Sequence, residues 1–591
     1  MTFPGSLNLP RPVSVPPDVQ PIDLDTPPAS EPAGDLPGTP ETPRRRVRDL
    51  LRRPSIDRGL TAFACVLVFA ALIFPNVLSR LTVLGFVRIP VEGAVLLGLL
   101  VVLPPRARRV VAVAAGVLLG WLVVEKCLDM GFFAELNRPF DPVLDWVLFN
   151  DAFNYVVDSY GKAAAIGAVA ALVLLVAAVM ALCTWALLRI GRLVGAHRKA
   201  SAITAGGIGL AWALALVTGL SITTAVPVAA RSTYTYAYDR VGQARAGFQD
   251  EAAFAKEVQV DAFRNTPADK MLTALRGKDV IFTFVESYGR SAVEAPGLAP
   301  GVDQVLDDGT ASLKAAGFAT ASGWLTSPTY GGGSWLAHST FESGLWINNQ
   351  QRYRDLVSSD RMTLTSAFKR IGVHTVSVMP GTTEAWPEGK FYGYDTVWDA
   401  RNLGYQGPRF SWAPMPDQYT LKQLNKIEYQ VPGRKPLMVE MPLVSSHTPW
   451  APLPTYLPDW NQIGDGSIYT QQVATANKPG ALWADKKQVR VEYGKSIQYT
   501  LTTLINWVEK YGDKNLVMVF LGDHQASPIV SGEGASHDVP VAIVAHDPAV
   551  LQAINGWGWD TGLRPSTRAP VWPMSDFRDK FFTAFGSTPQ P

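Results

Sequence analysis

Apolar residues form long runs in the first 230 residues of the chain and short runs, separated by polar segments, after that point. Five of the long runs come close to the roughly 20 residues that a helix needs to cross a bilayer. The predicted membrane spans are 60–79, 86–104, 109–128, 162–188 and 202–228. The second span is the weakest, because Arg88, Pro90 and Glu92 stand at its start, and an interfacial turn is the alternative there.

The charges between these runs predict how the spans are oriented. Arginine is frequent before the first span, and the loops between spans two and three and between spans four and five are basic. The loop between spans three and four is acidic instead. Because basic loops mark the cytoplasmic side, the pattern predicts a multi-pass plasma-membrane protein with a cytoplasmic N-terminus and an extracellular C-terminal part. A transporter is less favoured, since the spans lack a set of ionisable residues.

Composition marks the two ends of this membrane region. Residues 1–43 are rich in Pro, Ser and Asp and have no hydrophobic period, so we expect 1–58 to be a disordered cytoplasmic tail with a basic juxtamembrane segment. The five helices are expected within 59–228, and 229–275 is expected to be a polar, partly helical connector. The small residues Val228–Ala230 resemble a signal-peptidase site, with cleavage after Ala230, although an ordinary helix end is the preferred interpretation.

From 276 to 591, short apolar runs alternate with segments of helical periodicity such as 497–511. The predicted strands are Val280–Val285, Thr375–Met379, Leu437–Met441, Leu516–Leu521 and Val539–Val544. Strands interleaved with helices indicate an α/β layer structure with a mostly parallel central sheet. In such a sheet the functional site lies at the carboxyl ends of the strands.

Charge and cysteine content exclude several function classes. The net charge of +2 gives no argument for a polyanionic partner, and we expect no nucleic acid to bind. The three cysteines, Cys65, Cys127 and Cys183, all lie in the first half of the chain. A disulfide framework, a cysteine-rich zinc site and a catalytic cysteine in the C-terminal half are therefore excluded.

Two predicted strands end in residues that bind metals. One apolar run stops at Glu286, and another is followed by Asp523 and His524. Carboxylates and an imidazole at the ends of buried strands suit Mn²⁺, Zn²⁺ or Mg²⁺, with positions left open for a substrate. The alternative is that these side chains only cap the helices that follow.

A glycine-rich segment supplies a candidate nucleophile. Three glycines precede Ser334, and the residues after Ser334 have helical character. The free N–H groups and the dipole at a helix N-terminus favour a phosphate, and a serine beside a metal can ionise and attack phosphorus. The alternative is a flexible glycine loop in which Ser334 is the N-cap residue.

Histidines complete the candidate chemistry. His447 follows a predicted strand directly, where it could bind a phosphate oxygen or protonate a leaving alkoxide. His537 precedes the last predicted strand and is a possible neighbour of the site that contacts the substrate, whereas His338 has less support.

Together these motifs resemble the alkaline phosphatase/sulfatase superfamily, and in particular lipoteichoic acid synthase and its phosphoglycerol transferase relatives. The resemblance rests on Val-Glu286-Ser-Tyr-Gly, Gly-Gly-Gly-Ser334, Ser-His447-Thr-Pro and Gly-Asp523-His524 in this order, and on Trp386 ahead of Gly-Tyr-Asp. It implies five membrane helices followed by an extracellular sulfatase-like domain. It also implies a divalent metal, Mn²⁺ above all, on Glu286, Ser334, Asp523 and His524, with substrate contacts from His447 and Trp386.

The sequence also departs from this family. Serine replaces threonine at the nucleophile position, and Glu388 and Lys390 occupy the region where the family has an arginine near the tryptophan. The C/S-x-P/A-x-R context in which sulfatases form a formylglycine has no obvious counterpart. These departures concern the identity of the lipid substrate more than the presence of a metal.

The resemblance implies a membrane-anchored enzyme that moves a phosphoglycerol-type head group from a phospholipid to a cell-envelope glycan or polymer through a covalent Ser/Thr intermediate. The nearest alternatives are a phosphoethanolamine transferase and a sulfatase- or phosphodiesterase-type hydrolase on the same scaffold. A catalytically inactive sensor that only binds glycan or a partner is an alternative from another class, although the intact set of candidate residues argues against it.

Overall fold

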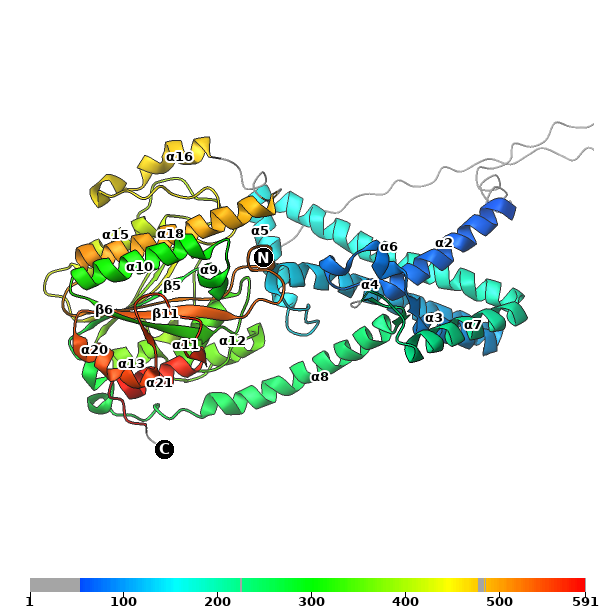
Figure 1. Cartoon of the computed structure of the whole chain (residues 1–591), viewed down its shortest axis with the longest axis horizontal. Coiled ribbons are helices and arrows are strands. Elements are labelled where there is room, and N and C mark those ends of the chain that lie inside the picture. Colours follow the sequence, from blue (N-terminus) through cyan, green and yellow to red (C-terminus); the bar gives the residue numbers. More distant parts are fainter. Residues whose placement is uncertain (1–53, 224–225, 477–482, 484, 590–591) are drawn as a thin grey trace, which may run out of the picture. The chain divides into compact units, whose positions relative to one another are not determined.

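The computed structural model describes residues 54–223, 226–476, 483 and 485–589 (Figure 1). Most of the predicted tail, 1–53, lies outside the described residues. Two regions of different character follow along the chain. Apolar helices occupy the part up to residue 217, and strands and helices alternate from residue 279 onward.

Four helices are long and apolar enough to cross a membrane. They are α2 (Pro54–Ile73), α4 (Pro105–Leu136), α6 (Lys162–Ala196) and α7 (Arg198–Val217). The predicted span at 86–104 contains only α3 (Val91–Val102), whose 12 residues extend about 18 Å, short of the roughly 30 Å hydrocarbon core. Pro90 precedes α3 and Pro104 follows it closely, so neither end extends as a helix. A fifth span is therefore not confirmed.

Two further helices belong to this part of the chain. The acidic loop between α4 and α6 contains α5 (Trp146–Tyr160). Helix α7 ends earlier than the predicted 228, and the residues after it form the short strands β2 (Ser221–Thr223), β3 (Val226–Pro227) and β4 (Ala229–Ala230). Strand β4 pairs with β1 (Ile89–Pro90). The segment expected to be a partly helical connector contains α8 (Ser232–Gln259).

A nine-stranded sheet forms the centre of the C-terminal part. Its strands are β5 (Asp279–Val285), β6 (Ala319–Thr326), β7 (His374–Met379), β8 (Thr396–Asp399), β9 (Leu437–Leu443), β10 (Leu516–Gly522), β11 (Asp538–Ala545), β12 (Asp560–Thr561) and β13 (Val571–Pro573). The order is β12-β6-β11-β10-β5-β9-β7-β8, with β13 also beside β6. The sheet is mixed: the neighbours from β8 to β10 are parallel, whereas β11 is antiparallel to both β10 and β6.

Helices cover both faces of this sheet (Figure 1). One face carries α10 (Ala299–Ala315), α15 (Asp417–Leu424) and α18 (Lys486–Tyr511), and the other carries α11 (Ser334–Ser343), α13 (Leu364–Arg370), α20 (Pro548–Ala553) and α21 (Asp576–Ala584). Shorter helices are α9 (Arg290–Glu294), α12 (Gln350–Val357), α14 (Gly389–Tyr392), α16 (Thr470–Thr475) and α19 (Pro528–Ser531).

Burial on both faces explains the apolar character of the central strands. Along β5, Ile281 and Val285 belong to the core with α10 and α18, whereas Phe282 and Phe284 belong to the core with α11 and α21. Successive side chains of a strand point to opposite faces, so a strand that is covered twice is apolar throughout. The five predicted strands are confirmed as β5, β7, β9, β10 and β11.

Candidate active site

Three neighbouring parallel strands deliver the candidate residues to one edge of the sheet. The register places Gly522 of β10 beside Val285 of β5, and Val285 beside Leu443 of β9. The residues that follow these strands, Glu286 after β5 and Asp523 after β10, therefore leave the sheet at the same level. His447 lies four residues after the end of β9.

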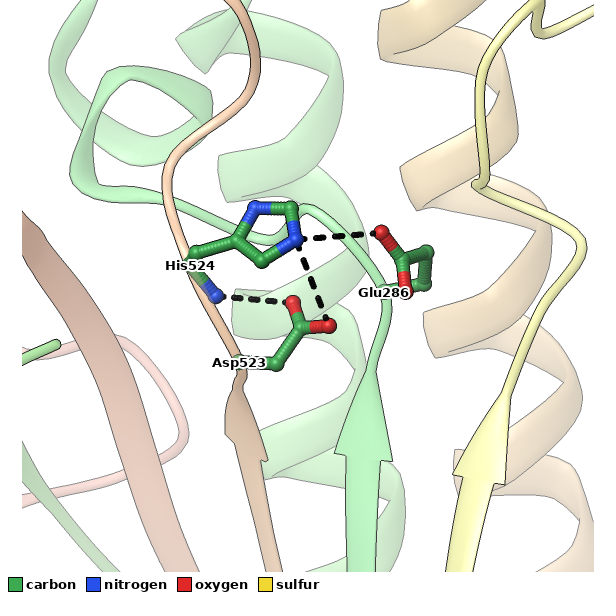
Figure 2. Close-up of side chains that lie close together, drawn as sticks. All are labelled: Glu286, Asp523 and His524. Carbon is green, nitrogen blue, oxygen red and sulfur yellow. Dashed lines mark hydrogen bonds and ion pairs between the residues drawn. The ribbon is translucent and has the colours of Figure 1, made fainter. Parts of the chain in front are cut away.

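Glu286, Asp523 and His524 converge at this edge (Figure 2). All three are buried, and each offers a ligand atom within 4.8 Å of those of the other two. The His524 Nε2 atom lies 3.4 Å from Glu286 Oε1 and 3.7 Å from Asp523 Oδ2. The structure thus brings together three of the four residues predicted to hold a metal.

Backbone groups fix how these side chains point. Asp523 Oδ1 accepts hydrogen bonds from the amides of Ser287 (2.8 Å) and His524 (2.7 Å), while its Oδ2 atom has no hydrogen-bond partner among the described residues. His524 Nδ1 lies 2.9 Å from the carbonyl oxygen of Gln525. Because a carbonyl oxygen only accepts hydrogen bonds, Nδ1 must carry a proton to make this one. This assigns the lone pair of the neutral ring to Nε2, which faces the two carboxylates.

Ser287 takes an unusual backbone conformation to make these contacts. Its φ angle is +58°, in the left-handed region that residues other than glycine rarely occupy. The Ser287 hydroxyl donates to Glu286 Oε1 at 2.9 Å, and Tyr493 donates to the Ser287 carbonyl oxygen at 2.8 Å. Strained residues of this kind persist where the surroundings hold them, which is common at functional sites.

The electrostatics of the cluster call for a cation. Burial and the negative charge of Glu286 raise the pKa of Asp523 to about 6. Burial would lower the pKa of His524, but the charges of Asp523 and Glu286 outweigh it and raise this pKa. Buried carboxylates are costly unless they are paired or bind a metal. The two carboxylates, the imidazole and the unpartnered Asp523 Oδ2 therefore fit a divalent cation.

Ser334 stands beside this cluster. It is the first residue of α11, and its hydroxyl donates to Glu286 Oε2 at 3.0 Å and lies 3.2 Å from His524 Nε2. The N-cap residue is Gly333, at a φ of +79° that favours glycine, so the interpretation of Ser334 as an N-cap is wrong. Strand β6 ends at the same edge of the sheet as β5 and β10, so the loop from β6 to α11 places Ser334 beside the carboxylates of Glu286 and Asp523.

A cavity of about 560 Å³ opens from Ser334. Its lining includes the predicted substrate residues His447 and Trp386, together with Glu286, His338, Tyr353, Glu384, Glu388, Trp412 and Glu440. The structure therefore gathers the predicted nucleophile and two predicted substrate contacts around one space.

His447 is held in a defined orientation. Its Nδ1 atom lies 2.5 Å from the carbonyl oxygen of Thr448, and its ring stacks on Trp412 at 3.7 Å between centroids and an interplanar angle of 15°. Burial lowers the pKa of His447 to about 4, so the ring is neutral at physiological pH. The contact with Thr448 assigns the proton to Nδ1 and leaves Nε2 as the acceptor.

His537 lies apart from this cavity. It precedes β11 at the same edge of the sheet, and its ring packs beside Tyr330 with 5.2 Å between centroids. It is not among the residues that line the cavity. Its role in substrate binding stays a prediction.

Comparison with protein families assigns the C-terminal part. Residues 278–541 match the sulfatase family model. The chain carries a sulfatase-family domain. The resemblance to the alkaline phosphatase/sulfatase superfamily is thereby confirmed, and every predicted site residue lies inside the matched range of this sulfatase domain. A comparison with curated proteins finds no match.

Three solved structures with a similar fold are the following. The lipoteichoic acid synthase LtaP from Listeria monocytogenes is 15% identical, with a TM-score of 0.36 over 56% of this chain and 78% of that chain. The phosphoglycerol transferase GacH from Streptococcus pyogenes is 12% identical, with a TM-score of 0.35 over 57% and 81%. The C-terminal periplasmic domain of EcEptC from Escherichia coli is 12% identical, with a TM-score of 0.35 over 53% and 83%.

Several residues of the sulfatase-domain cavity were missed by the sequence analysis or, like His338, received little support from it. Glu440 carried a signal, because it is the one charged residue inside the apolar run of β9. Trp412 carried no signal in the sequence, since it lies in a loop without a recognisable motif. His338 follows Ser334 by one helical turn, and this spacing places both side chains on one side of α11.

The glycine of Gly-Asp-His is required for close packing. A Cβ atom at Gly522 would lie 1.8 Å from the carbonyl oxygen of Tyr288. We expect Gly522→Ala to force β10 away from the segment after β5 and to lower the Tm by roughly 5–10 °C. Gly556→Ala is the matched control, because no atom lies within 4 Å of its added Cβ. Equal Tm values for the two variants, from tryptophan fluorescence, would contradict this account.

Proposed function

We propose that the protein is a membrane-anchored, metal-dependent phosphotransferase that works through a covalent phospho-Ser334 intermediate. One observation carries the proposal: the Ser334 hydroxyl lies within hydrogen-bond distance of both Glu286 and His524, where two carboxylates and an imidazole converge. A divalent metal held by Glu286, Ser334, Asp523 and His524 would lower the pKa of the hydroxyl and offset charge on the phosphoryl oxygens.

In the first half-reaction, Ser334 Oγ forms a bond to the phosphorus of a phospholipid. The bond between phosphorus and the diacylglycerol oxygen breaks, and the hydroxyl proton of Ser334 ends on the released diacylglycerol. Glu286 orients the hydroxyl before attack, since its Oε2 accepts the Ser334 proton in a 3.0 Å hydrogen bond. Ser334 stands at the N-terminus of α11, where the helix dipole favours the phosphoryl oxygens.

In the second half-reaction, an acceptor hydroxyl attacks the phospho-Ser334 ester. The bond between phosphorus and Ser334 Oγ breaks, and the acceptor's proton ends on Ser334. His447 suits this half-reaction, because its neutral ring has a free lone pair on Nε2 that can accept the proton of the incoming alcohol. A role for His447 as the acid that protonates diacylglycerol is less suited to a ring with a pKa of about 4.

The finer assignment rests on the sequence pattern. The family resemblance favours a phosphoglycerol-type head group as the group transferred, a cell-envelope glycan or polymer as acceptor, and Mn²⁺ as the metal. A phosphoethanolamine head group is the second candidate, supported by the charges that line the cavity. The positive-inside pattern supports a cytoplasmic tail over 1–58, spans within 59–228, a connector over 229–275 and an extracellular catalytic domain over 276–591.

The test uses the full chain in nanodiscs that contain fluorescent phospholipids. With Mn²⁺ we expect release of diacylglycerol, and with a chelator we expect none. Addition of a glycerol or sugar acceptor should yield a phosphorylated acceptor. Release of the free phosphorylated head group into water at an equal rate, with or without acceptor, would instead indicate a hydrolase. Failure to release diacylglycerol from any donor would contradict the proposal.

A further inference from the structure

Several carboxyl groups line the cavity beside Ser334. Glu384, Glu388 and Glu440 line it in addition to Glu286. Among the described residues, no lysine or arginine lines this space. The two lining histidines add no positive charge either, because burial lowers the pKa of both His338 and His447 to about 4.

Two of these carboxylates have no hydrogen-bond or ion-pair partner among the described residues. Glu384 is exposed and Glu388 is half-buried, and neither side chain makes a hydrogen bond or an ion pair with the described residues. Glu440 differs, because it is 2% exposed and accepts a hydrogen bond from the Tyr394 hydroxyl. Burial, together with the neighbouring carboxyl of Glu342, raises the pKa of Glu440, and this carboxyl group already has Tyr394 as a protein partner. Glu384 and Glu388 therefore supply the unpaired negative charge.

Aromatic rings surround the same space. Trp335, Tyr353, Trp386 and Trp412 all line the cavity. Trp386 packs beside Tyr392 and Tyr394, with 5.4 and 6.2 Å between ring centroids, so its position is fixed. Glu388 follows Trp386 by two residues and begins α14 as its N-cap. Aromatic faces and carboxylates that share a partly dry space attract organic cations.

A separate observation also indicates a ligand in this space. The Nε2 atom of His338 is buried beside the cavity and has no hydrogen-bond partner among the described residues. Its ring stacks on Phe284 at 4.0 Å between centroids, so the ring does not turn freely toward another partner. Buried polar atoms are normally paired, and a polar group of a bound molecule would satisfy this one.

We infer that the cavity selects a head group that carries an ammonium group, as in phosphoethanolamine. The phosphoryl end lies at Ser334 and the ammonium end lies between Glu388, Glu384 and the ring of Trp386. The inference rests on the proposed phosphotransfer, and it names a different donor from the phosphoglycerol type that the family resemblance implies. Phosphoglycerol has no positive charge to pair with two carboxylates, and phosphoserine adds a negative charge that they repel.

The first experiment compares donors on the full chain in nanodiscs with Mn²⁺. We expect kcat/KM for diacylglycerol release to be at least tenfold higher with phosphatidylethanolamine than with phosphatidylglycerol. In Glu388→Gln this ratio should fall about tenfold, mainly through KM, and further in the double variant with Glu384→Gln. Glu509→Gln, a change on α18 outside the cavity, should leave the ratio unchanged. A wild-type preference for phosphatidylglycerol, or an equal loss with both donors in Glu388→Gln, would overturn the inference.

A binding measurement separates this inference from the proposed chemistry. Ser334→Ala protein cannot form the ester, yet it should bind O-phosphoethanolamine at least tenfold more tightly than sn-glycerol phosphate in calorimetry. The added Glu388→Gln change should remove this difference. If turnover fails while the binding preference is present, the phosphotransfer proposal fails and the ammonium site stands. Equal binding of the two phosphates would overturn the ammonium site whatever the turnover.

Discussion

Ser334→Ala should lower metal-dependent diacylglycerol release by about 10³-fold or more, because it removes the atom that forms the bond to phosphorus. The hydroxyl is partly buried and makes no contact that the sheet needs, so the fold should be unchanged. Time-course assays of diacylglycerol release from fluorescent phospholipid test this result. Mass spectrometry of the trapped phospho-Ser334 ester in the wild-type protein provides a second test.

Thr329→Ala is the control for the nucleophile. Thr329 lies in the same loop, and its side chain packs near Gly333 rather than against the carboxylate cluster. We expect this variant to keep most of the wild-type turnover. Thr340 is excluded as a substitute nucleophile, because its hydroxyl is buried and donates to the Leu336 carbonyl oxygen within α11. Full activity in Ser334→Ala would disprove the assignment of Ser334 as the nucleophile and would make Thr329 the next candidate.

Asp523→Asn should remove metal binding and most activity together. Wild-type protein at a metal concentration of about 100 times its Kd gains roughly 2.7 kcal/mol of stability, since the metal binds only the folded state. The variant should show almost none of this gain, because it lacks the carboxylate whose Oδ2 has no other partner. Without metal the order should reverse, and Asp523→Asn should melt above the wild type, since it removes one of two buried negative charges.

Thermal melts with Mn²⁺ and with chelator test both halves of this expectation. Asp308→Asn is the matched control, since Asp308 is exposed on α10 and distant in sequence from the cluster. It should melt as the wild type does under both conditions. An Asp523→Asn protein that keeps the full metal-induced rise in Tm would show that the carboxylate is not a ligand.

The central strands and the cluster at their ends were predictable because both depend on local sequence. Strands covered on two faces form continuous apolar runs, and an acidic residue that ends such a run is visible without a structure. Glu286 and Asp523 met this condition. The register of β5 and β10, which brings the two together, is set by tertiary pairing and had to be assumed.

Other elements had no local signal. Strand β6 reads Ala-Thr-Ala-Ser-Gly-Trp-Leu-Thr, which is too small and polar for an apolar run, yet it is almost wholly buried between β11 and the short edge strands. The span at 86–104 was predicted by hydropathy alone, whereas the prolines near its ends limit α3 to 12 residues. The lining of the cavity could not be predicted for a different reason, since Trp335, Glu388 and Trp412 come from three stretches of the chain that are far apart in sequence.

The segment from Gly381 to Glu388 follows β7, whereas the carboxylate cluster follows β5 and β10. In the proposed reaction, the residues that make the bond and those that select the head group therefore lie on separate stretches of the chain, which meet only in the folded molecule. Such a division allows related enzymes to differ in the loop after β7, and therefore in the phospholipid that they use, while the residues of the reactive centre stay the same. The loop after β7 is accordingly the place where natural variation in donor should accumulate.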